Sequence, residues 1–289
     1  MALAVLAVVA WSRRRFTPRL FLIALTQFLL ASIATFVNRW PAMLASLSTS
    51  QPYVLQIGGL IGAGSVGLLI AAAVPSLIVG TLPLEIEEAA RVSDRVAQRL
   101  GVVAGLIGAG VLVGAGWLRT PAWASAPDVA PLATTWPIVA VVLGPITTFL
   151  MRMALVAGVL AAMGRQTSGW TRRRPTGLIA IAAIGGTAVG APMGSALGGW
   201  VAAVLVTAAA LAVVAAWLLS LDLTMVPLAL GVVGASEALL TGAARVYPGA
   251  MLDGIIAAVA VLGVAWWWFR ALRRRRDRSA GEATIPVAA

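Results

Sequence analysis

Long apolar stretches, separated by short polar segments, follow one another along the whole chain. Runs such as VAAVLVTAAALAVVAAWLL are continuously apolar and lack the alternation of polar and apolar positions that is typical of membrane β-strands. A helix needs roughly 20 apolar residues to cross a bilayer. The pattern therefore predicts an all-α, polytopic transmembrane helix bundle. We expect about eight full spans, at residues 20–36, 54–80, 101–117, 137–163, 177–196, 199–220, 225–243 and 251–269.

The same pattern predicts how the chain is organised. Residues 1–271 form one multi-span membrane domain, in which residues 81–100 are a cytoplasmic amphipathic connector, and residues 272–289 form a basic cytoplasmic tail. The first eleven residues, MALAVLAVVAW, are apolar but too short to cross a membrane. They resemble the second half of a helix, which favours a chain that is the C-terminal part of a longer protein. The alternative is a short interfacial or re-entrant piece that begins at Met1.

Composition supports a lipid environment. Hydrophobic residues make up 61% of the 289 residues and charged residues 11%, whereas a soluble domain is roughly half apolar and a quarter charged. The net charge of +11 does not indicate nucleic-acid binding, because the arginines do not form one patch. They are sorted between the loops instead.

This sorting predicts the orientation, because cytoplasmic loops carry an excess of arginine. The side with many arginines holds Arg13, Arg14, Arg15, Arg19, Arg91, Arg95, Arg99, Arg165, Arg172, Arg173, Arg174 and the run from Arg270 to Arg278, and the other side holds Arg39, Arg119 and Arg245. We therefore expect a multi-pass protein of the bacterial inner (plasma) membrane with a cytoplasmic C-terminus. The run RALRRRRDR favours a stop-transfer anchor; binding of anionic lipid headgroups is the alternative.

Glycines recur at helical spacing in two regions. Residues 178–220 carry no charge over 43 positions, too many for one crossing, so we place a break near GAPMGSALGGW. Small residues at intervals of about four let helix backbones approach closely in lipid. The pattern predicts tight helix packing at Gly186, Gly190, Gly194 and Gly198, and in the third span at Gly101, Gly105, Gly110 and Gly114.

The inventory of catalytic residue types is short. The chain contains no His, Cys or Lys, which excludes Ser-His and Ser-Lys nucleophile pairs, cysteine chemistry and the lysine of a Walker A loop. We therefore expect no catalytic residue, no cofactor and no metal in this chain, and the sequence favours a protein that is not an enzyme.

Two ionisable residues are predicted at membrane depth, where charge is costly and usually has a role. Arg152 lies in PITTFLMRMALVAGVL and Glu237 in VPLALGVVGASEALLTG. They are a candidate intramembrane polar pair on a solute or proton path. A structural ion pair, or two side chains that reach water separately, is the favoured interpretation.

Charge is also concentrated in TLPLEIEEAARVSDRVAQRL, residues 81–100, which holds four of the ten acidic residues. Opposite charges three or four positions apart are typical of a helix surface. A solvated, amphipathic cytoplasmic helix accounts for the stretch without a further function.

Part of this stretch, LPLEIEEAARV, is similar to the start of the cytoplasmic coupling loop of ABC importer permeases. Glu88, Ala89 and Ala90 match the Glu-Ala-Ala of that loop, but Asp94 stands where the loop has glycine, and the later Ile-Xaa-Leu-Pro is missing. Such loops lie about two spans from the C-terminus, whereas we expect six spans after this one. The resemblance implies a loop that docks a separate ATPase, with the candidate residues Glu85, Glu87, Glu88, Arg91, Asp94 and Arg95.

A second resemblance covers about a quarter of the chain. The segments NRWPAMLASLSTSQPYVLQIGGLIGAGSVGLLIAAAVPSLIVG and YPGAMLDGIIAAVAVLGVAWWWFRALRRRR resemble membrane stretches of large bacterial proteins of the CPBP family (CAAX proteases and bacteriocin-processing enzymes). That family uses Glu-Glu-Xaa-Xaa-Xaa-Arg and histidines. Here Arg91 follows Glu87 and Glu88 one residue too early, and histidine is absent, so no catalytic residue carries over.

Two functional hypotheses follow. The first is a non-catalytic membrane module, or the C-terminal part, of a CPBP-like protein. The alternative is a permease subunit that moves a small solute and is coupled through the 81–100 loop. The expected partners are the lipid bilayer and a membrane or cytoplasmic protein, and no nucleic acid.

Overall fold

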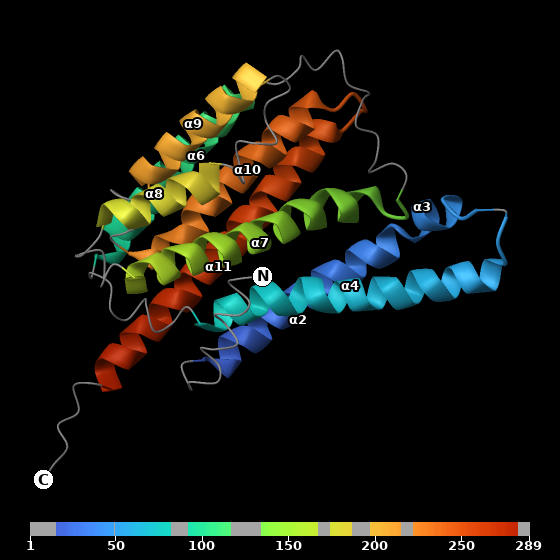
Figure 1. The fold of residues 1–289 in the computed structure, drawn as a ribbon, viewed down its shortest axis with the longest axis horizontal. Coiled ribbons are helices and arrows are strands. Elements are labelled where there is room, and N and C mark those ends of the chain that lie inside the picture. The colour runs from blue at the N-terminus through green and yellow to red at the C-terminus, as the bar shows by residue number, and fades with distance from the viewer. Residues whose placement is uncertain are drawn as a thin grey trace, which may run out of the picture. The chain divides into compact units, whose positions relative to one another are not determined.

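The computed structural model describes residues 16–48, 50–81, 92–116, 134–166, 174–186, 197–214 and 222–282. Helices and turns make up these residues, and no strand occurs among them. The prediction of an all-α bundle is confirmed (Figure 1). The helices are α2 (Pro18–Asn38), α3 (Trp40–Ala45), α4 (Tyr53–Thr81), α6 (Asp94–Gly116), α7 (Pro137–Gln166), α8 (Arg174–Gly185), α9 (Leu197–Val214), the 3₁₀ helix η6 (Leu223–Met225), α10 (Val226–Ala244) and α11 (Ala250–Glu282).

Within the described ranges, six helices are long and apolar enough to cross a membrane: α2, α4, α6, α7, α10 and α11. About eight spans were expected, and six are found in the described part of the chain. The described part of α8 has 12 residues and is about 18 Å long, against a hydrocarbon core of about 30 Å. The apolar part of α9 is Trp200–Val214, which is also short. The expected spans at 177–196 and 199–220 continue into residues 187–196 and 215–221, which lie outside the described residues.

Several boundaries agree with the predicted spans and others do not. Helices α2, α4 and α7 match within a few residues. Helix α6 begins at Asp94 rather than at residue 101, so the end of the expected connector belongs to the same helix as the span. Helix α11 continues to Glu282 and carries the arginine run in helical form. The first eleven residues and residues 82–91 of the connector lie outside the described residues.

The chain divides into two compact units, which are described separately. The first consists of residues 1–81, 127–155 and 238–261, and the second of residues 82–126, 156–237 and 262–289.

In the first unit, α2 and α4 pack side by side along their lengths (Figure 1). The backbone N–H of Thr17 donates to the carbonyl oxygen of Gly80 at 2.9 Å, which joins the start of α2 to the end of α4. At the other end of α2, the buried Asn38 side chain holds the residue that precedes α7. Its Nδ2 donates to the Trp136 carbonyl at 3.0 Å, and the Trp136 N–H donates to its Oδ1 at 2.7 Å. One amide thus bonds both backbone groups of Trp136: the N–H lies at a helix start and lacks an intrahelical partner, whereas the carbonyl oxygen also accepts from the N–H groups of Val139 and Ala140.

Helix α4 is the least covered of the six candidate spans. Only 6% of its most apolar 18 residues are buried, compared with 67% for the corresponding part of α10. Large apolar side chains such as Val54, Leu55 and Val66 are exposed along it. An exposed apolar surface of this extent is expected of a helix that faces lipid.

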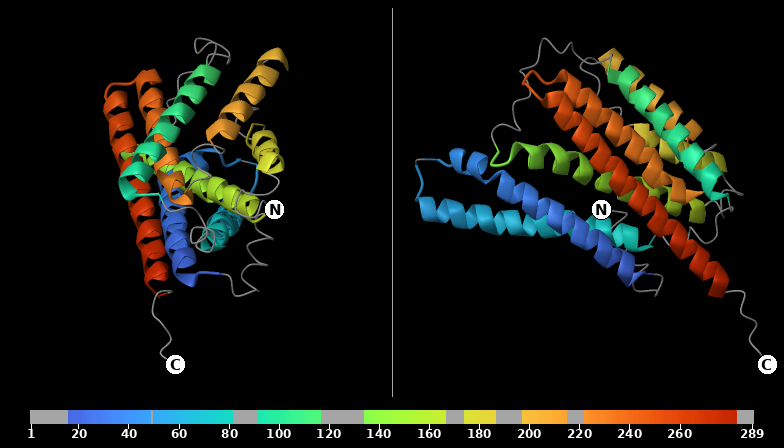
Figure 2. Two further views of the ribbon diagram at one scale, coloured as in Figure 1. Left: turned by 90° about the vertical axis from the view of Figure 1, so that its left-hand side faces the viewer. Right: turned by 180° about the vertical axis from the view of Figure 1, so that it is seen from behind.

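In the second unit, α6 packs against α9 and η6, and α8 packs against α9 (Figure 2). Glycines mark the contact of α6 with α10 and that of α8 with α9. A methyl group at Gly105 would lie 2.6 Å from the Ala229 carbonyl oxygen on α10, and one at Gly186 would lie 2.6 Å from the Ala208 Cβ. The absence of a side chain therefore allows the helices to approach each other closely.

Helices α10 and α11 also meet through small residues, separately in each unit. In the first, a methyl group at Gly242 would lie 2.9 Å from the Gly254 Cα. In the second, a methyl group at Gly231 would collide with the Cβ of Ala265. Glycine packing thus recurs along this helix pair.

The prediction of tight packing is confirmed for Gly101, Gly105 and Gly186. It is wrong for Gly110, Gly114 and Gly198, where a methyl group would meet nothing within 4 Å. Gly190 and Gly194 lie outside the described residues. Spacing identifies a glycine stripe but not the end of the stripe that a neighbouring helix covers.

We expect Gly105→Ala to lower the thermal unfolding midpoint of the detergent-solubilised protein. The new methyl group would meet a backbone oxygen and the Val232 Cβ at 2.6 Å, and overpacking of this kind costs about 1–3 kcal/mol. The matched control is Gly110→Ala on the same helix, which faces open space and should gain about 1 kcal/mol of helix propensity. Equal stabilisation by both substitutions would contradict close packing at Gly105.

Candidate functional site

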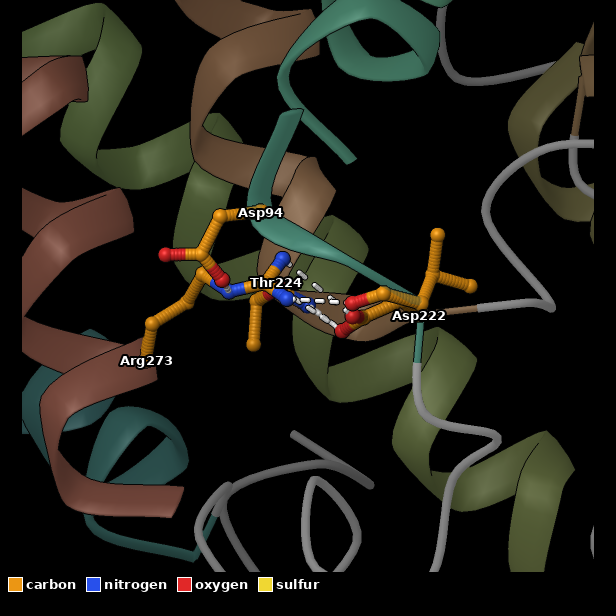
Figure 3. A network of polar contacts seen from close by, with 5 residues as sticks. Asp94, Asp222, Thr224 and Arg273 are labelled. Atoms are coloured by element: carbon orange, nitrogen blue, oxygen red, sulfur yellow. Dashed lines mark hydrogen bonds and ion pairs between the residues drawn. The ribbon is translucent and has the colours of Figure 1, made fainter. Parts of the chain in front are cut away.

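A buried arginine near the end of the membrane part of α11 organises a polar cluster in the second unit. Arg273 is 3% exposed, and its guanidinium lies over the Phe269 ring, 5.5 Å from the ring centroid. A cation in such a place requires negative partners, because the desolvation penalty of an unpaired buried charge is large. Two aspartates and one backbone carbonyl provide them (Figure 3).

The first partner is Asp222, which precedes η6 and is fully buried. Its Oδ1 accepts hydrogen bonds from the backbone N–H of Thr224 at 2.9 Å and from the Thr224 hydroxyl at 2.7 Å. Its Oδ2 lies 3.6 Å from Nη1 of Arg273. One carboxylate thus caps the short helix and balances the buried cation at the same time.

The second partner is the start of α6. Oδ1 of Asp94 lies 2.7 Å from Nε of Arg273, and Nη2 of Arg273 donates to the carbonyl oxygen of Val92. Unlike Asp222, the Asp94 side chain is 69% exposed. Its contribution to stability is therefore screened by solvent, whereas that of Asp222 is not.

The cluster joins three segments that are far apart in sequence: residues 92–94, residues 222–224 and α11. It contains no activated nucleophile. Among the described residues, no group of three or more His, Cys, Asp or Glu side chains is arranged to hold a metal ion. The arrangement can hold helix ends together and attract charged groups.

The candidate intramembrane pair falls in two different units. Arg152 lies in the part of α7 that belongs to the first unit, and Glu237 in the part of α10 that belongs to the second. Both side chains are half-buried, and both take part in interactions. A pairing of the two with each other stays a prediction.

The candidate docking loop is described only at its end. Glu85, Glu87, Glu88 and Arg91 lie outside the described residues. Asp94 contacts Arg273 of the same chain, and Arg95 is exposed in the first turn of α6.

A smaller polar contact lies in the first unit, in the turn between α10 and α11. The Tyr247 hydroxyl donates to Oδ2 of Asp253 at 3.0 Å. Burial raises the pKa of the Tyr247 phenol above its ordinary value of 10.0, and the hydrogen bond to Asp253 acts in the same direction, while the nearby Arg245 opposes both. The contact holds the turn and has no further chemistry.

The sequence analysis did not identify the Arg273 cluster. Asp222 was a usable signal, because it is a lone acid between two strongly apolar stretches, where an ionisable residue is costly. Arg273 gave none, since it is one of six arginines within nine residues, from Arg270 to Arg278.

Comparison of the chain with models of protein families, with curated proteins and with solved structures found no match. The resemblances to CPBP proteins and to ABC permeases therefore stay predictions.

We expect Arg273→Met to lower the free energy of unfolding by about 3–5 kcal/mol, because it removes the cation that lies 3.6 Å from the buried carboxylate of Asp222. The exposed neighbour Arg274→Met is the matched control and should change stability little. Adding Asp222→Asn to Arg273→Met should restore part of the loss. Additive losses in that double variant, measured by thermal unfolding in detergent, would contradict the ion pair.

Proposed function

We propose that this chain is a non-catalytic, multi-pass membrane module of the bacterial inner membrane, with its C-terminus in the cytoplasm. The six apolar helices support an integral membrane protein. The excess of arginine on one side supports the orientation. Kinship with CPBP proteins, as an accessory portion without the catalytic motif, is part of this proposal.

The observation that carries the proposal is that the end of the charged connector binds another helix of the same chain. The Val92 carbonyl and the Asp94 carboxylate both bind Arg273 on α11 of the same chain. These groups act as an internal anchor that holds the start of α6. Such a role supports a membrane module, because it accounts for charge at this position without a second protein.

The orientation can be tested by cysteine labelling, because the chain has no cysteine of its own. We expect Ser48→Cys, in the turn before α4, to react with a membrane-impermeant maleimide in intact spheroplasts. Ser93→Cys, directly before α6, should react only after the membrane is permeabilised. Both residues are exposed, so access to the reagent depends on the side of the membrane. The opposite pattern would reverse the orientation, and labelling of both in intact spheroplasts would contradict it.

The permease alternative is tested by replacing Glu87 and Glu88 with alanine. The double variant is expressed in a strain from which the gene has been deleted. If the chain is a membrane module, the variant should reach the wild-type level in the membrane fraction. It should also restore any solute uptake that the deletion abolished. A docking loop requires these acids, so uptake would fall to the level of the deletion strain while the amount of membrane-inserted protein stayed unchanged. That result would favour a permease subunit. Arg99→Gln is the matched control, because it removes an exposed charge from the described end of the same stretch at a position outside the candidate docking residues.

A further inference from the structure

An open hollow of about 200 Å³ lies beside the Arg273 cluster in the second unit. A water molecule occupies about 30 Å³ in the liquid, so the hollow can take a chemical group several times that size. Two helices form its walls, the first turns of α6 and the last membrane turns of α11. The lining residues are Asp94, Gln98, Phe269, Arg270, Arg273 and Arg274.

The lining carries more positive than negative charge. The Asp94 carboxylate is held by Arg273, so it does not cancel the charge of the outer arginines. Arg270 and Arg274 are both exposed, and within the described part of the chain no ion pair engages either of them. Arg270 lies over the Trp266 ring, 4.8 Å from its centroid, which limits the directions in which its guanidinium can point. Two guanidinium groups are thus presented beside one opening.

The buried arginine adds a further positive charge to this lining. Among the described residues, Nε and Nη1 of Arg273 have no hydrogen-bond partner, although the side chain is buried. Nε is 2.7 Å from Asp94 Oδ1, so the two groups attract each other as charges, but the N–H is not aligned for a hydrogen bond. Both nitrogens are shielded from solvent, so they contribute positive charge rather than direct contacts. The lining as a whole therefore favours an anionic group.

The position along α11 indicates what that group is. Trp266 and Trp267 are 37% and 44% exposed and lie one turn before the arginines of the hollow. Exposed tryptophans mark the boundary between hydrocarbon and headgroups, and the residues that follow lie at the depth of the lipid phosphates. Helix α11 remains helical through this boundary to Glu282. The opening is therefore at the level where lipid headgroups, rather than soluble metabolites, are most concentrated.

We propose that this hollow binds the phosphate of an anionic phospholipid headgroup. Arg270 and Arg274 match a phosphate with paired N–H donors, a geometry that suits guanidinium groups, and the Gln98 amide can donate a further hydrogen bond. The acyl chains would lie along the apolar part of α11 that ends at Phe269. The proposal requires only that the chain lies in a membrane, and it is independent of the CPBP and permease hypotheses.

The test uses the full chain, purified in neutral detergent, with tryptophan fluorescence to follow thermal unfolding. Phosphatidylglycerol, phosphatidylcholine and inorganic phosphate are titrated separately. We expect phosphatidylglycerol alone to raise the unfolding midpoint in a saturable manner, because a ligand that binds only the folded state stabilises it. Arg270→Gln with Arg274→Gln should raise the half-saturating lipid concentration about tenfold or more, since each charge-assisted hydrogen bond contributes a factor of about ten.

The matched control removes two charges from exposed positions outside the hollow, Arg95→Gln with Arg99→Gln on the same first turns of α6. It should keep the lipid response. An equal loss in both double variants would indicate diffuse attraction to an anionic surface and would overturn the site. An equal rise of the unfolding midpoint with inorganic phosphate would identify a soluble phosphate as the ligand and would overturn the proposal. An unchanged midpoint with phosphatidylglycerol would also overturn it.

A second variant covers the case in which loss of the two arginines unfolds the protein. Gln98→Phe fills the hollow without changing its charge. We expect it to keep the unfolding midpoint in phosphatidylcholine and to lose the response to phosphatidylglycerol. An undiminished response in a well-folded Gln98→Phe protein would overturn the proposed position of the headgroup.

Discussion

The buried charge of Arg273 is the constraint on which one described end of the second unit depends. A guanidinium that is 3% exposed must be balanced nearby, and the balance comes from Asp222 before η6 and from Asp94 at the start of α6. Each aspartate also stabilises the start of a helix in its own segment. Asp222 caps η6, and Asp94 begins a helix whose positive N-terminal end favours a carboxylate. The ion pairs therefore determine where three distant segments meet.

The remainder of the packing depends on contacts between small residues. In lipid there is no hydrophobic driving force between helices, so association relies on close backbone approach. Gly105 brings α6 against α10, and Gly186 brings α8 against α9. Many large apolar side chains are exposed, as along α4, although others such as Phe28, Phe149 and Trp268 are fully buried. Exposed apolar side chains are expected where lipid is the solvent.

The cluster and the hollow beside it hold two kinds of charge in the second unit. Charges that are fully buried, like that of Asp222, have structural partners. Exposed ones at the same end of α11, those of Arg270 and Arg274, remain available to a ligand. The difference lies in solvent access: a buried charge must be paired within the fold, whereas a headgroup arginine is stable in water and gains from contact with phosphate.

The sequence alone determined the membrane environment, the helical class and the approximate positions of α2, α4, α7, α10 and α11, because apolar runs of sufficient length have one stable form in lipid. Of the eight expected spans, six are candidate spans in the described part of the chain, and those at 177–196 and 199–220 continue into residues outside it. Glycine spacing identified Gly105 but could not distinguish it from Gly110, because only the neighbouring helix decides which face is covered. The link between Asp94, Asp222 and Arg273 was decided by tertiary structure alone: residues up to 179 positions apart leave no local pattern, and only the packing of α6, η6 and α11 brings their charges within 4 Å.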